Sequence, residues 1–313
     1  MKSIQLDKII SHPGPGHRDD FLAVSILLAA SENYPVVMRK DPSKADCIDT
    51  KTAVVDIGQN HNPDILMFDH HQFPSDHEPT CALNLVVDYL GLTDAFKLCY
   101  SWYEITGIID SKGPMQAANH LGINPKNNFF QLMSPMEEWL LAEWGQYKVL
   151  YDPNTWPDDV NDMMKFLSKG TDAREGAKLY GLMCQFGESL INRAQEFEQR
   201  WKDLKDTRTH GIPDTNLRWL DVSSFDRNDD PAMAVNQFIR TECPEAVVSV
   251  SQDDRGDGMT LYRVNDHPQI DFSKLKNEES ILFAHNNGFV AKTKFMMSTE
   301  EVSNLISKGV KRL

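Results

Sequence analysis

Short, continuous apolar runs alternate with helical patterns over residues 1–115, and this alternation constrains the fold more than any other feature of the chain. The clearest run, TAVVDIG at residues 52–58, has only apolar residues between Thr52 and Asp56. A strand with one face in water alternates apolar and polar residues, whereas a continuous run is typical of a parallel strand buried on both faces. Because helical patterns separate the successive runs, we predict an α/β domain built on a parallel sheet.

Three further runs predict strands in this part of the chain, and three stretches predict helices. The strands are expected in IQLDKIIS (residues 4–11), PVVMRK (35–40) and ILMFDHH (65–71). The helices are expected in FLAVSILLAASE (21–32), CALNLVVDYLG (81–91) and AFKLCYSWYEITGII (95–109). Asp19 and Asp20 stand at the N-terminus of the first helix, where carboxylates suit the helix dipole.

The pattern changes twice in the remainder of the chain. From about residue 127 to residue 205 we expect helices, a turn-rich break at residues 152–162 and no strand. After about residue 207 strands return, in LRWLDVSS, in a hairpin of EAVVSVSQ and MTLYRV, and on both sides of the turn in SILFAHNNGFVAKTKF. STEEVSNLISKGV predicts a last helix, with Ser298 as N-cap and Glu301 closing a capping box. We therefore expect a domain of residues 1–205 that includes the helical region, and a smaller α+β domain of residues 206–313.

The formal net charge of −14 limits the partners of the protein. A protein that grips long duplex nucleic acid by its backbone is usually basic, so that role is disfavoured. A small anionic substrate held by metal ions stays compatible with this charge, because the local field of a site can oppose the net charge.

Cysteine usage and hydropathy indicate the compartment. The five cysteines are scattered and form no CxxC pair, which disfavours a disulfide framework and a thiolate zinc site. The longest apolar stretches, such as FLAVSILLAA, are too short to span a bilayer. Because MKSIQLDKII also lacks a signal-peptide pattern, we expect a cytoplasmic protein without a membrane partner.

Histidines and aspartates gather at the ends of four predicted elements. They are His12, His17 and Asp19 after the first strand, Asp56 after the third, Asp69, His70 and His71 after the fourth, and Asp110 after the helix that ends in ITGII. A single aspartate of this kind is usually a helix cap or turn residue, and a single histidine is usually a satisfied polar group. Ligands of open α/β sheets bind at the carboxyl ends of the strands, so the convergence of four such ends indicates a site. His61, His77, His120, His210 and His267 lie outside these ends and have no predicted function.

The donor atoms of this set are imidazole nitrogens and carboxylate oxygens. That combination suits Mn²⁺ or Mg²⁺, with Co²⁺, Zn²⁺ and Fe²⁺ as alternatives. The candidates outnumber the needs of one ion, and two ions about 3.5–4 Å apart are the usual arrangement for phosphoryl transfer. In the turn SHPGPGHRDDF, Pro13 and Pro15 restrict the backbone, while Gly14 and Gly16 allow a positive φ or a close backbone approach.

The block Phe68-Asp69-His70-His71-Gln72, together with Asp56 in VVDIG, resembles the DHH phosphoesterase superfamily. Within it, the chain is most similar to the Myg (melanocyte proliferating gene) family of exonuclease-like proteins. That family opens with a Thr-His-x-Gly-x-Phe-His-x-Asp-Glu turn. The residues that stand in this turn are Ser11, His12, Gly14, His17, Asp19 and Asp20.

Several positions depart from the family pattern. Gly16 replaces the aromatic residue of the turn, and Asp20 replaces its glutamate. Ile109, Asp110 and Gly113 resemble a later block, in which Ser111-Lys112 stand where one Asn is usual. Near the end of the chain, YRV and LFAHNNGFVAKTK resemble the closing segment of the family, with Ala291-Lys292 in place of its Gly-Gly pair. The change at Gly16 and the loss of the Gly-Gly pair bear on substrate preference rather than on metal binding.

The resemblance implies a two-metal phosphoesterase with a defined set of residues. His12, His17 and Asp56 would hold one ion, Asp19, His70 and Asp110 would hold the other, and Asp56 would bridge them. His71 would face the substrate phosphate, and Asp69 would orient the cluster. The nucleophile would be a water whose pKa the ions lower. In the C-terminal domain, the candidate phosphate contacts are Arg255, Arg263, His285, Lys292 and Lys294.

Three functions are compatible with these features. The first is a two-metal phosphodiesterase or exonuclease that acts on short single-stranded RNA or DNA. The second is a hydrolase of small phosphate compounds, such as nucleotides, cyclic dinucleotides or pyrophosphate, which the acidic composition favours. The third is a non-catalytic metal-binding or partner-binding protein, although all the expected ligands of an enzyme are present. The oligomeric state stays open.

Overall fold

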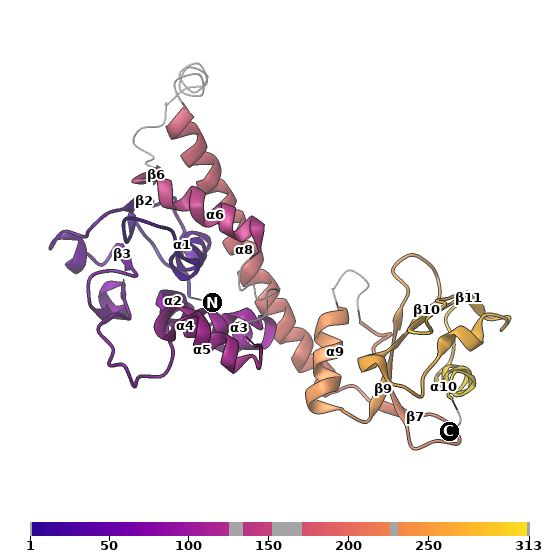
Figure 1. The fold of residues 1–313 in the computed structure, drawn as a ribbon. Helices are drawn as coiled ribbons and strands as arrows, with labels where there is room; N and C mark the ends of the chain where they lie inside the picture. Colours follow the sequence, from indigo (N-terminus) through magenta and orange to yellow (C-terminus); the bar gives the residue numbers. More distant parts are fainter. Residues whose placement is uncertain (1, 125–133, 152–170, 226–230, 312–313) are drawn as a thin grey trace, which may run out of the picture. The chain divides into compact units, whose positions relative to one another are not determined.

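The computed structural model describes residues 2–124, 134–151, 171–225 and 231–311 (Figure 1). The chain divides into two compact units, Met1–Glu196 and Phe197–Leu313, and each contains a six-stranded sheet. The break expected at residues 152–162 lies outside the described residues. Of the helices that the structure describes, none combines the length and the apolar composition needed to cross a bilayer.

The sheet of the first unit is parallel at its centre, as predicted. Its strand order is β4-β5-β3-β1-β2-β6, and β5, β3, β1 and β2 pair in parallel. These four strands lie within the four predicted runs: β1 (Lys8–Ser11), β2 (Val36–Arg39), β3 (Thr52–Val55) and β5 (Met67–Phe68). All four residues of β3 are buried, which accounts for its continuous apolar run.

Two antiparallel strands form the edges of this sheet. β4 (His61–Asn62) pairs with β5, and β6 (Val149–Tyr151) pairs with β2. The prediction of no strand between residues 127 and 205 is therefore wrong at β6. Only three residues long, this strand is stabilised by its long-range pairing with β2, which no local pattern reveals.

Helices pack around α1 (Arg18–Ala30), which is buried along nearly its whole length. α1 contacts α2 (Ala82–Tyr89), α4 (Trp102–Lys112) and α6 (Pro135–Gln146). The helix predicted at residues 95–109 is interrupted at Tyr100, so α3 (Thr93–Cys99) and α4 are separate, and α5 (Pro114–His120) follows. α8 (Thr171–Lys205) approaches α1 closely at Gly187, where a Cβ would lie 2.0 Å from the carbonyl oxygen of Ser25.

The second unit is an α+β structure with a mainly antiparallel sheet of order β11-β12-β10-β9-β8-β7. Its strands are β7 (Thr209–Gly211), β8 (Arg218–Asp221), β9 (Ala246–Gln252), β10 (Met259–Arg263), β11 (Ile281–Ala284) and β12 (Val290–Thr293). β8 and β9 pair in parallel and are connected by α9 (Pro231–Glu242). The predicted hairpin forms from β9 and β10, and α10 (Thr299–Lys308) begins at the predicted cap, Ser298, with Glu301 in a capping box.

Candidate metal centre

The turn between β1 and α1 carries a histidine at each end and two glycines with separate roles. Gly14 has a φ of +97°, a backbone conformation that residues with a side chain rarely adopt. Gly16 lies against α6, because a Cβ there would come within 2.5 Å of the Leu141 carbonyl oxygen and 2.6 Å of Trp144 Cδ1. The predicted roles, a positive φ and a close approach, are thus confirmed. No aromatic side chain fits at position 16, since Trp144 lies in the adjoining space.

The buried guanidinium of Arg39, at the end of β2, holds this turn in place. It donates hydrogen bonds to the carbonyl oxygens of Gly14 (2.8 Å) and Pro15 (3.1 Å). It also donates to the carbonyl oxygen of Trp144 (3.2 Å) and lies over the Trp144 ring, 4.7 Å from its centroid. One arginine therefore ties the turn to α6. Sequence reasoning missed Arg39, because a strand-end arginine carries no signal for this role.

The buried carboxylate of Asp20 orients the same turn. Its Oδ1 accepts a hydrogen bond from the backbone N–H of His17 (2.8 Å), at the start of α1. Its Oδ2 accepts from the hydroxyl of Ser11 (3.0 Å) and the indole N–H of Trp144 (2.8 Å). Burial raises the pKa of Asp20, and the nearby His12 and the indole offset only part of that effect. Asp20 thus connects the Ser11 hydroxyl before the turn with the His17 backbone at its end.

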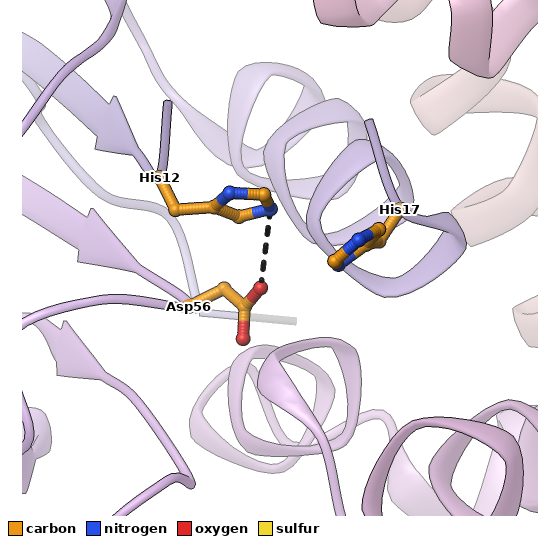
Figure 2. A group of neighbouring side chains, drawn as sticks. All are labelled: His12, His17 and Asp56. Carbon is orange, nitrogen blue, oxygen red and sulfur yellow. Dashed lines mark ion pairs between the residues drawn. The ribbon is translucent and has the colours of Figure 1, made fainter. Parts of the chain in front are cut away.

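Asp56, directly after β3, faces two groups of donor atoms with its two carboxylate oxygens. Oδ2 lies 3.5 Å from His12 Nε2, and the side chains of His12, His17 and Asp56 point toward one another (Figure 2). Oδ1 lies 3.3 Å from His70 Nε2. The backbone of Asp56 has a φ of 59°, in the left-handed region, where Asp and Asn are more common than most residues. With its backbone in this conformation, Asp56 places its buried carboxylate between the two groups.

The second group consists of Asp19, Asp56, His70 and Asp110, each offering one donor atom within 4.8 Å of the others. His70 Nε2 lies 2.7 Å from Asp110 Oδ2. The sequence predicts Asp110 after the end of a helix, and this prediction is wrong. Asp110 lies inside α4, which continues to Lys112. The Asp110 carboxylate still lies near Asp19, because α4 packs against α1, which carries Asp19.

The polar atoms of these groups fit a divalent cation. Five buried atoms have no hydrogen-bond partner among the described residues: His12 Nε2, Asp19 Oδ1, Asp56 Oδ1, His70 Nε2 and Asp110 Oδ2. Burial and the charges of Asp56, Asp110 and Asp20 raise the pKa of Asp19 well above its usual value. Burial lowers the pKa of His70, but the carboxylates of Asp110 and Asp56 outweigh it and raise that pKa to about 10. So many buried carboxylates require compensating positive charge.

Asp69 and His71 form a pair beside these groups. Asp69 is buried, and its Oδ1 accepts hydrogen bonds from the backbone N–H of His71 (3.0 Å) and from His71 Nδ1 (2.7 Å). Burial raises the pKa of Asp69, but the hydrogen bonds from His71 and from the Gln59 backbone outweigh it and leave the pKa lowered. The ionised Asp69 therefore fixes the proton on Nδ1 and leaves Nε2 available. The His71 side chain is 50% exposed, and its Nδ1 lies 3.8 Å from Asp56 Oδ1.

The five candidate phosphate contacts all lie in the second unit, and three of them have partners there. Lys292 forms an ion pair with the buried carboxylate of Asp253. Arg263 donates to the Ile270 carbonyl oxygen (3.1 Å) and pairs with Asp266 (3.0 Å). His285 Nδ1 accepts from the backbone N–H of Asn287 (3.1 Å). Arg255 and Lys294 are exposed. Substrate binding by these residues stays a prediction.

A search of curated proteins finds no match. The structure of the pGpG-specific phosphodiesterase PggH from Vibrio cholerae matches at 14% identity with a TM-score of 0.24, over 97% of this chain and 96% of that chain. RecJ from Thermus thermophilus, solved in complex with Mn²⁺, matches at 14% identity with a TM-score of 0.28, over 96% of this chain and 51% of that chain. At these TM-scores neither likeness carries an argument.

A family model gives the more specific result. MYG1_exonuc, described as Uncharacterised protein family (UPF0160), matches residues 8–81, the segment that carries all the predicted ligands except Asp110. The match supports the assignment of the chain as a hydrolase. Over residues 8–81, the resemblance of this chain to the Myg family is thereby confirmed.

Proposed function

We propose that the protein is a two-metal phosphodiesterase that acts on short single-stranded RNA or DNA. The observation that carries the proposal is the position of Asp56, whose two carboxylate oxygens face two groups of histidine and aspartate donor atoms. A carboxylate in this position suits a bridging ligand between two ions. The match to an exonuclease family over the same segment supports the phosphodiester class of substrate.

The proposed ligands follow two of the three groups of donor atoms that could hold an ion; the third group is Asp56, His70 and His71. His12, His17 and Asp56 would hold one ion, and Asp19, Asp56, His70 and Asp110 would hold the other. Nitrogen and carboxylate oxygen donors suit Mn²⁺, with Mg²⁺ as the alternative. Arg39 and Asp20 are proposed as positioning residues, because they fix the turn that carries both histidines.

The reaction adds one water across a phosphodiester and breaks one P–O bond. Bound divalent ions would supply charge neutralisation at the phosphate and a lower pKa of the attacking water. The chain would supply orientation: the hydrogen bond from His71 Nδ1 to Asp69 leaves Nε2 free to contact a phosphate oxygen. Buried Asp69 holds this imidazole at a fixed angle, because its carboxylate is itself fixed by the Gln59 backbone N–H (2.6 Å).

Substrate selection is proposed for the second unit, through Arg255, Arg263, His285, Lys292 and Lys294. With a net charge of −14, the protein needs local cations to hold a polyanion. The same net charge favours the second candidate function, hydrolysis of small phosphate compounds such as dinucleotides or pyrophosphate. A small substrate needs few contacts beyond the metal centre, whereas a longer strand needs several.

A substrate screen tests the proposal. The purified full-length protein would be treated with a chelator, reloaded with Mn²⁺, and assayed on short RNA and DNA oligomers, dinucleotides and pyrophosphate. Hydrolysis of oligomers that depends on Mn²⁺ is expected. Activity on dinucleotides or pyrophosphate alone would select the second candidate, and bound Mn²⁺ without hydrolysis of any substrate would refute both.

A further inference from the structure

A cavity of about 200 Å³ lies beside the candidate metal centre, within the first unit. Its walls include His70, His71 and Asp110 on the side of the metal centre, and the loop of Phe73, Ser75, His77 and Glu78 together with Lys112 elsewhere. Pockets that enclose a drug-sized ligand typically measure 300–1,000 Å³. This smaller cavity suits part of a nucleotide, with the remainder along its open side.

Lys112 is fixed in this cavity by neutral partners. At the end of α4, its ammonium donates to the carbonyl oxygens of Ser75 (2.6 Å) and His77 (2.9 Å). No ion pair joins Lys112 to a carboxylate of the described residues, and an ammonium has three donor hydrogens. A cation whose direct partners are neutral carbonyl oxygens is suited to an anionic ligand. Lys112 also stands where the family pattern has no lysine, so it is a feature of this chain.

An aromatic pair forms part of the same wall. The rings of Phe73 and His77 stack with 4.3 Å between centroids and 13° between planes. His77 is exposed and offers an aromatic surface from this pair. Such surfaces hold bases of single-stranded nucleic acids by stacking, with little dependence on base identity.

We propose that this cavity is a nucleotide subsite, in which Lys112 contacts a phosphate of the substrate and the Phe73–His77 pair stacks on the adjoining base. The inference rests on the proposed function, since it places this nucleotide next to the scissile phosphate. The phosphate and base contacts come from one loop and one helix end. They are therefore independent of the cations in the second unit.

Equilibrium binding to the Mn²⁺-loaded full-length protein tests the subsite without requiring turnover. Titration calorimetry would measure the affinity for AMP and for inorganic phosphate in wild type and in Lys112→Ala, His77→Ala and His77→Phe. Lys112→Ala is expected to weaken both ligands about tenfold, as for loss of a charged hydrogen bond. His77→Ala is expected to weaken AMP about tenfold and leave phosphate unchanged, while His77→Phe restores AMP binding. The matched control is Lys97→Ala, an exposed lysine outside this cavity.

The outcomes separate the subsite from the proposed function. If wild type binds AMP with the expected dependence on Lys112 and His77 but hydrolyses no phosphodiester, the subsite stands and the proposed function falls. If wild type hydrolyses oligomers while both alanine variants bind AMP and phosphate as wild type does, the subsite is wrong and the function stands. Absence of AMP binding to wild type, or an equal loss of both ligands in His77→Ala, also overturns the subsite.

Discussion

The bridging position of Asp56 predicts that Asp56→Asn removes most of the stabilisation that Mn²⁺ gives to the folded protein. Each ion that binds only the native state stabilises it by about 2.7 kcal/mol at a free concentration 100 times its Kd, so two ions give about 5 kcal/mol. The first unit spans 196 residues, for which 1 kcal/mol corresponds to roughly 2–4 °C in Tm. Wild type should therefore gain about 10–20 °C with Mn²⁺.

Asparagine is the appropriate replacement at this position. With a φ of 59°, Asp56 lies in a region where alanine would add strain of about 1–2 kcal/mol, whereas asparagine adopts it readily. Asparagine also removes one negative charge from beside Asp19 and Asp110, so the metal-free variant should be at least as stable as metal-free wild type. A loss of the Mn²⁺ effect then reports on metal binding rather than on folding.

The assay is thermal unfolding with and without Mn²⁺, combined with the metal content of the purified proteins. Asp56→Asn should gain less than about 5 °C and hold less metal than any variant of a terminal ligand. The control is Asp110→Asn, which belongs to only one of the two groups and should retain about half of the wild-type gain. The bridging role would be refuted if Asp56→Asn responded to Mn²⁺ as wild type does, or if the two variants lost equal amounts of metal.

Three further predictions concern two histidines of the centre, the turn at Gly16 and a buried aspartate elsewhere in the first unit, Asp46. His71→Ala should keep most of the bound metal but lose turnover, whereas His70→Ala should lose metal; equal losses of both properties would end this division of roles. Gly16→Ala should destabilise the protein by about 1–3 kcal/mol in urea unfolding, because its Cβ meets the α6 backbone, while Gly181→Ala, with open space around it, should be neutral or stabilising. Burial raises the pKa of Asp46, but hydrogen bonds from Lys8 and Ser43 outweigh it and depress the pKa. The ionised Asp46 therefore stabilises the folded protein above pH ~4, and this stabilisation is lost as the pH falls below that value. The difference in stability between wild type and Asp46→Asn should therefore shrink between pH ~5 and pH ~2, and a constant difference would contradict this origin.

Much of the candidate site could be predicted because its information is local. A continuous apolar run predicts a buried parallel strand, and the polar residue after it then lies at a known edge of the sheet. Asp56 and the Asp69–His71 block follow β3 and β5 in this way, and the two strands are neighbours in the sheet. The sequence predicts Asp110 as a candidate ligand, but after the end of its helix. In the structure α4 continues through Asp110 to Lys112, because no residue before Gly113 ends the helix. The match to the family model covers the same local motifs, at residues 8–81.

The hydrogen bonds that hold the turn of the site in place could not be predicted in this way, because the residues that form them are distant in sequence. Trp144 donates to Asp20 across 124 positions of the chain, and Arg39 reaches the Trp144 carbonyl oxygen across 105 positions. Neither pairing leaves a periodic or compositional signal, since both depend on how α6 packs against α1 and the turn. Gly16 stands where the family pattern has an aromatic residue, so the sequence motif looks incomplete at this position. The structure shows Trp144 in the space beside Gly16. A departure from a family pattern in a turn is therefore best judged together with the helix that packs on it, because the two segments share one volume.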